Sequence, residues 1–132
     1  MRENTQTIII NRPIGEVFEF STNPKNTGKW FDGIAEERAS EWPPKIGTIY
    51  ENRGDLNSDN WNRYRVSDFE ANKTFELTNG NFSVRYTYRV LDNGATEMTY
   101  REWVAAEGGG IARGNHDRSV HQIKGFVGGA VI

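Results

Sequence analysis

The chain has 132 residues, with 16 basic and 18 acidic side chains, a net charge of -2 and no cysteine. The length predicts one domain over residues 1–132, and the interspersed, nearly balanced charges argue against a nucleic-acid partner. Without cysteine, disulfides, thiolate metal sites and thiol nucleophiles are excluded. No apolar run is long enough for a signal peptide or a membrane span, so a cytoplasmic protein is expected.

The first third of the chain predicts one strand and two short helices. β-branched side chains over residues 5–10 indicate a strand. Apolar side chains recur at helical spacing over residues 14–22, which predicts an amphipathic helix. A second short helix or turn is expected over residues 25–31, and it would turn Trp30 and Phe31 towards the core.

The remainder of the chain predicts an antiparallel meander followed by a helix. Strands are expected over residues 36–42, 48–53, 61–69, 74–78, 82–91 and 96–104, and a closing helix over 115–127. On that helix, Val120, Ile123 and Val127 fall on one side together with His116, and His121 lies on the polar side. The predicted fold class is therefore α+β.

Two hairpins fix the expected register of the last strands. Asn79-Gly80 is a strong signal for a two-residue loop, which would pair Leu77 with Phe82. At residues 92–94, a three-residue loop with a left-handed Gly94 pairs Tyr86 with Tyr100 and places Arg89 opposite Glu97. The result is one continuous apolar face made of Phe75, Leu77, Phe82, Val84, Tyr86, Tyr88, Val90, Met98 and Tyr100.

Short sequence motifs in the first third of the chain resemble those of a known superfamily. Residues 10–20 read Ile-Asn-Arg-Pro-Ile-Gly-Glu-Val-Phe-Glu-Phe, and Asn-Pro-Lys-Asn at 23–26 and Lys29-Trp30 follow. This resembles the opening of the SRPBCC superfamily, which is START-related and similar to the birch-pollen allergen, and specifically its polyketide cyclase/dehydrase and lipid-transport group. The resemblance covers residues 5 to about 104.

This resemblance implies the helix-grip fold. In that fold a curved antiparallel sheet, here of about seven strands, wraps around the carboxy-terminal helix, with two short helices after the first strand. An elongated cavity for an apolar or amphipathic ligand lies between the sheet and the helix. The same scaffold hosts binders, transporters, cyclases and hydrolases, so the resemblance indicates the fold more specifically than the function.

Side chains expected to line such a cavity come from the apolar face, the second short helix, neighbouring strands and the closing helix. They are Trp30, Tyr50, Tyr64, Val84, Tyr86, Tyr88, Met98, Tyr100, His116, Val120 and Ile123. Tyr86 and Tyr100 are the best candidates to direct hydroxyls at a ligand. Either side of strand 61–69 can face inward, and an inward Arg63 and Arg65 would bind a ligand carboxylate.

No catalytic residue, metal site or cofactor is predicted. His116 and His121 are five residues apart, which misses the spacing of two ligands on one helical face. The adjacent Glu36 and Glu37 point to opposite faces of a strand, so they cannot act together.

The leading prediction is a carrier or sensor of a small hydrophobic or aromatic ligand, as a monomer or weak homodimer. A cofactor-free cyclase, dehydratase or hydrolase that uses pocket tyrosines or arginines is the first alternative. A protein-interaction module of the chaperone-activator type is the second, and it would display an exposed apolar patch instead of a cavity.

Overall fold

The computed structural model of the chain describes residues 3–104. The elements in chain order are β1 (Glu3–Ile10), α1 (Ile14–Thr22), α2 (Pro24–Trp30), β2 (Glu36–Ala39), β3 (Ile49–Arg53), β4 (Asn62–Glu70), β5 (Thr74–Thr78), β6 (Phe82–Val90) and β7 (Thr96–Val104). All the strands and both short helices expected from the sequence are present. The second strand ends earlier than expected, before Trp42 and the two prolines that follow it. The closing helix predicted over residues 115–127 lies outside the described residues.

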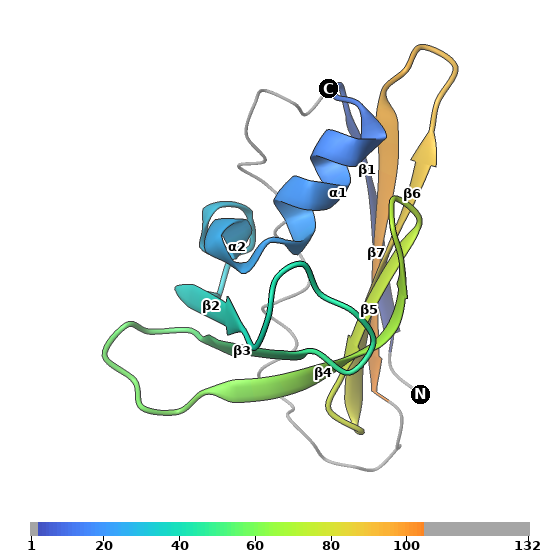
Figure 1. Cartoon of the computed structure of the whole chain (residues 1–132). Helices are drawn as coiled ribbons and strands as arrows, with labels where there is room; N and C mark the ends of the chain where they lie inside the picture. Colours follow the sequence, from blue (N-terminus) through green and yellow to red (C-terminus); the bar gives the residue numbers. More distant parts are fainter. Residues whose placement is uncertain (1–2, 105–132) are drawn as a thin grey trace.

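The strands form one curved, open antiparallel sheet in the order β1-β7-β6-β5-β4-β3-β2 (Figure 1). The chain begins at one edge, crosses through α1 and α2 to the other edge, and returns strand by strand until β7 pairs with β1. Both helices lie on the same side of the sheet, where α1 contacts β6 and α2 contacts β2 (Figure 1). We call this side of the sheet the inner face and the opposite side the outer face.

The junction between the two helices is set by local capping. The side chain of Asn23 accepts a hydrogen bond from the backbone N–H of Lys25 at 3.0 Å, and Pro24 occupies the first turn of α2. Trp30 at the end of α2 is 1% exposed, and Phe31 beside it is also buried. The prediction that this segment turns both rings into the core is confirmed.

The predicted register of the β6–β7 hairpin is confirmed. Tyr86 pairs with Tyr100 and Arg89 with Glu97, while Gly94 has a φ of 88°, a conformation that glycine adopts without steric cost. The Arg89 and Glu97 side chains also form an ion pair at 2.8 Å. Charge pairing and the left-handed glycine therefore select the same three-residue loop.

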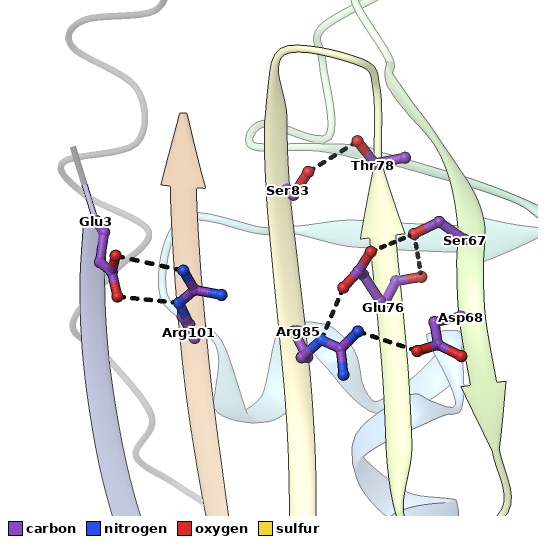
Figure 2. A network of polar contacts seen from close by, with 8 residues as sticks. All are labelled: Glu3, Ser67, Asp68, Glu76, Thr78, Ser83, Arg85 and Arg101. Carbon is purple, nitrogen blue, oxygen red and sulfur yellow. Dashed lines mark hydrogen bonds and ion pairs between the residues drawn. The ribbon is translucent and has the colours of Figure 1, made fainter. Parts of the chain in front are cut away.

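This register places Arg85 directly opposite Arg101 on the outer face. Each guanidinium has its own acidic partners (Figure 2): Arg85 bonds Glu76 at 2.8 Å and Asp68 at 3.0 Å, and Arg101 bonds Glu3 at 3.0 Å. The two like charges are therefore neutralised from opposite sides, and the pairing is tolerated.

The predicted register of the β5–β6 hairpin is wrong. Leu77 pairs with Val84 instead of Phe82, because the loop spans residues 79–82. Asn79 holds this longer loop: its side-chain oxygen accepts hydrogen bonds from the backbone N–H groups of Asn81 at 2.9 Å and Phe82 at 2.8 Å. The error is two residues, so each side chain still points to the face that was predicted.

Val90 is the exception on the predicted apolar face, since it is 55% exposed. The first residue of β5, Thr74, pairs with Thr87, so β6 runs on past the end of its neighbour. Val90 consequently has β7 on one side and no strand on the other. The expectation that it belongs to the core is wrong.

Candidate functional site

The inner face is a continuous layer of buried side chains, most of them aromatic. Ring contacts connect it from helix to sheet: Trp30 meets Tyr86 with ring centroids 5.8 Å apart, and Tyr86 meets both Phe75 and Tyr100 at 5.7 Å. Of the residues predicted to line a cavity, those buried here are Trp30, Tyr50, Val84, Tyr86, Tyr88, Met98 and Tyr100. Tyr64 is partly buried at the edge of this layer, and His116, Val120 and Ile123 lie outside the described residues.

The orientation of β4 decides the question left open by the sequence. Tyr64 pairs with the buried Tyr50, so it takes the inner side, and Arg63 and Arg65 are exposed. Trp61, on the arginine side, lies under the guanidinium of Arg38 at 3.7 Å. The hypothesis that these arginines bind a ligand carboxylate on the inner face is therefore wrong.

The tyrosine hydroxyls on the inner face differ in their hydrogen bonds. Tyr50 donates to the backbone carbonyl of Thr22 at 2.8 Å, and the Tyr88 hydroxyl bonds that of Ser21 at 2.6 Å. These two hydrogen bonds connect α1 to strands β3 and β6 of the sheet. The hydroxyl of Tyr86, in contrast, forms no hydrogen bond with any residue in the described range 3–104.

Glu37 on β2 is a functional candidate that the sequence did not identify. Its neighbour Glu36 points outward and bonds Arg53 at 2.6 Å, as the alternation of a strand requires. Glu37 points inward, where its carboxylate accepts hydrogen bonds from Thr27 Oγ1 at 2.6 Å and Asn52 Nδ2 at 3.3 Å. Burial raises the pKa of Glu37 to about 7, and these two hydrogen bonds only partly oppose the rise.

Glu102 on β7 is a second inward carboxylate, and it is 1% exposed. It pairs with Val84 and accepts a hydrogen bond from the Tyr100 hydroxyl at 2.5 Å. The signal for it was present in the sequence, because Glu102 continues the alternation of Met98 and Tyr100 on the same strand. Its charge kept it off the predicted inner face, which was defined by apolar residues alone.

The two carboxylates act electrostatically on the tyrosines between them. Burial is the main cause that raises the pKa of Tyr64, to about 12, and the charges of Glu37 and Glu102 raise it further. Burial also places the pKa of Tyr86 well above its ordinary value, and again both carboxylates contribute. These hydroxyls therefore stay protonated at physiological pH and remain hydrogen-bond donors.

The arrangement thus offers tyrosine hydroxyls and carboxylate oxygens on an otherwise apolar wall. Within residues 3–104, no group of three His, Asp or Glu side chains lies close enough to hold a metal ion. In the same range, no helix is long and apolar enough to cross a membrane. The chemistry available on the inner face is apolar contact, hydrogen bonding and proton exchange at Glu37.

No protein-family model and no curated protein sequence matches the chain. Solved structures do resemble it. Protein BH1534 of Bacillus halodurans is 18% identical, with a TM-score of 0.64 over 86% of this chain and 76% of its own. Protein NE0264 of Nitrosomonas europaea is 12% identical, with a TM-score of 0.64 over 80% of this chain and 77% of its own.

A further similar structure is the di-domain ARO/CYC BexL from the BE-7585A biosynthetic pathway. It is 13% identical, with a TM-score of 0.58 over 82% of this chain and 37% of that longer chain. At these identities the likeness concerns the fold. It agrees with the α+β fold of the described residues, a curved antiparallel sheet with two helices.

Proposed function

We propose that the protein binds a small hydrophobic or amphipathic ligand against the inner face of its sheet, in a cavity closed by the helix expected over residues 115–127. The observation that carries this proposal is Tyr86: the residue is 5% exposed within an aromatic layer, and its hydroxyl has no hydrogen-bond partner among the described residues. Most polar groups in a protein interior are hydrogen-bonded to protein or water. The Tyr86 hydroxyl is therefore available to a ligand group.

The family resemblance supports the same proposal. The opening motif around residues 10–30 resembles the SRPBCC group of polyketide cyclases and lipid transporters, and an ARO/CYC protein is among the similar structures. In this proposal the chain is a single SRPBCC-type domain. Trp30, Tyr86, Met98 and Tyr100 form one wall of the cavity, and His116, Val120 and Ile123 contribute the opposite wall.

The affinity expected from such a wall is modest. Burying roughly 250 Å² of apolar ligand surface contributes about 6 kcal/mol before the cost of immobilising the ligand. The dissociation constant for a simple aromatic ligand should therefore be on the order of micromolar or weaker.

Native mass spectrometry of freshly purified protein, followed by titration with a fluorescent apolar probe, tests the proposal. The folded wild type should bind the probe saturably, and Tyr86→Ala should weaken the binding because it removes part of the wall. If the folded wild type neither carries a small molecule nor binds the probe, its inner face is filled by its own side chains. The binding proposal is then wrong.

A second candidate function is a cofactor-free cyclase, dehydratase or hydrolase. The observation in its favour is Glu37, because a carboxyl group with a pKa of about 7 can both accept and donate a proton at physiological pH. In that case the molecule that copurifies would be converted during incubation. The rate should change through pH about 7 and be lost in Glu37→Gln, whereas an unchanged ligand excludes turnover of that molecule.

A further inference from the structure

Glu37 and Tyr86 come from strands that are not neighbours in the sheet, yet both lie against the same turn of α2. Thr27 of α2 donates its hydroxyl proton to the Glu37 carboxylate at 2.6 Å. Trp30 follows three residues later on the helix, and its ring contacts the Tyr86 ring with centroids 5.8 Å apart. Glu37 therefore borders α2 through Thr27, and Tyr86 borders it through the ring of Trp30.

Both side chains keep hydrogen-bonding capacity at this point. Tyr86 is 5% exposed, and its hydroxyl has no hydrogen bond to residues 3–104. Each carboxylate oxygen of Glu37 accepts one hydrogen bond, from Thr27 and from Asn52, and a carboxylate has about four acceptor positions. A donor and an acceptor with unused positions therefore border the same apolar wall.

The charge of Glu37 is held by neutral groups. Its partners are a threonine and an asparagine, and Asn52 is itself fixed by Asn62, whose Nδ2 donates to Asn52 Oδ1 at 3.1 Å. In the described part of the chain Glu37 forms no ion pair, and every lysine and arginine there is exposed or on the outer face. A ligand carboxylate would meet an uncompensated negative charge here.

We propose that Glu37 and Tyr86 together bind the hydroxyl group of a hydrophobic ligand, which makes the ligand a phenol or an alcohol with an apolar ring body. A hydroxyl can donate its proton to the Glu37 carboxylate and accept the proton of the Tyr86 hydroxyl at once. A carboxylate can only accept, so it would meet the charge of Glu37. An ammonium group could donate to Glu37 and to the Tyr86 oxygen, but it would leave the Tyr86 proton without an acceptor. This inference rests on the proposed function and specifies the ligand class for the same face.

The acid-base properties of the two groups agree with these roles. The Tyr86 hydroxyl remains protonated because burial and the charge of Glu37 both raise its pKa. Glu37 is ionised at pH 8, since its pKa is about 7. The other titratable groups that act on Tyr86 are Tyr50, Tyr88 and Glu102, and Tyr64 on β4 borders the same layer. Burial raises the pKa values of the three tyrosines, so they stay neutral at that pH.

A matched series of naphthalene probes tests the inference by isothermal titration at pH 8. The probes are 2-naphthol, 2-methylnaphthalene, 2-naphthoic acid and 2-(aminomethyl)naphthalene, which share one ring body. The proteins are wild type, Glu37→Gln, Tyr86→Phe and the control Glu36→Gln. The control changes the adjacent glutamate, which faces outward and bonds Arg53. Near-UV circular dichroism verifies that each variant is folded.

Wild type should bind 2-naphthol about tenfold more tightly than 2-methylnaphthalene, the ratio expected for one hydrogen bond to a charged group. 2-Naphthoic acid should be the weakest probe. Glu37→Gln and Tyr86→Phe should each remove most of the advantage of 2-naphthol and leave 2-methylnaphthalene within about twofold. Glu36→Gln should keep the wild-type order.

Three results would overturn the inference. If 2-naphthol and 2-methylnaphthalene bind wild type equally, no hydroxyl site exists, although the binding proposal stands. If the amine or the carboxylate binds best, the ligand class is wrong. If no probe binds the folded wild type, the proposed function fails and this inference fails with it.

Discussion

Glu37→Gln should change how the stability of the protein depends on pH. Glu37 is half-buried and has no cation partner among residues 3–104, and desolvation raises its pKa from 4.5 to about 7. The folded-state pKa lies above the unfolded value, so ionisation of Glu37 opposes folding. This effect is absent below pH about 4.5 and grows as the pH rises towards 7. The wild type should therefore lose stability over this interval, and the glutamine variant should not.

The size of the effect follows from the same pKa values. A rise from 4.5 to about 7 corresponds to about 3 kcal/mol of unfolding free energy. Glutamine also has a constant cost, because its Oε1 can accept from Asn52 and its Nε2 can donate to Thr27 Oγ1, but both hydrogen bonds then lack the charge of the carboxylate. That cost is about 1–2 kcal/mol and does not vary with pH. The informative quantity is therefore the change with pH of the difference in unfolding free energy between Glu37→Gln and wild type, and not the size of that difference at one pH.

Urea unfolding at pH values from 4.5 to 8, followed by tryptophan fluorescence, measures this slope. The stability of Glu37→Gln relative to wild type should increase by up to about 3 kcal/mol across the interval. The control Glu36→Gln removes a partly exposed ion pair with Arg53 and should change stability by at most about 1 kcal/mol. A difference between Glu37→Gln and wild type that stays constant over this pH range would refute the assignment of a raised pKa to Glu37.

Three further substitutions test the fold around the site by urea unfolding. Tyr100→Phe removes the hydrogen bond to the buried Glu102 and should cost about 1.5–3 kcal/mol; no loss would mean that Glu102 does not depend on this donor. Gly94→Ala should cost about 1–2 kcal/mol because the residue has a φ of 88°, and a Cβ there would meet no other atom, so backbone strain is the only cost. A neutral result would contradict the left-handed conformation of Gly94 in the β6–β7 loop. Val90→Thr should stay within about 0.5 kcal/mol of wild type because Val90 is 55% exposed, and a larger loss would return Val90 to the core.

The order of the elements was predictable because local signals define each of them. Proline and asparagine mark the start of α2, and charge pairing across β6 and β7 agrees with the left-handed Gly94. The β5–β6 register was not predictable from Asn79-Gly80 alone. In this loop the Asn79 side chain bonds the backbone of Asn81 and Phe82, so a longer turn replaces the two-residue loop.

The polar part of the candidate site was less predictable than its aromatic wall. Alternation along a strand states that Glu36 and Glu37 face opposite sides, but only the position of α2 decides which of them is inward. The side of β4 that faces inward depends likewise on its pairing with Tyr50, which is a contact distant in sequence. The expected cavity residues His116, Val120 and Ile123 remain predictions, since they lie outside the described residues.

A nuclear magnetic resonance titration with 2-naphthol tests most directly whether a small hydrophobic ligand binds on the inner face. The methyl signal of Met98 and the ring signals of Tyr86 report on the inner face, while Trp103 stacks against Arg101 and reports on the outer face. If the ligand binds there, the Met98 and Tyr86 signals shift saturably and the Trp103 signals stay unchanged. Shifts at Trp103 alone, or none at any of the three in folded protein, would contradict binding on the inner face.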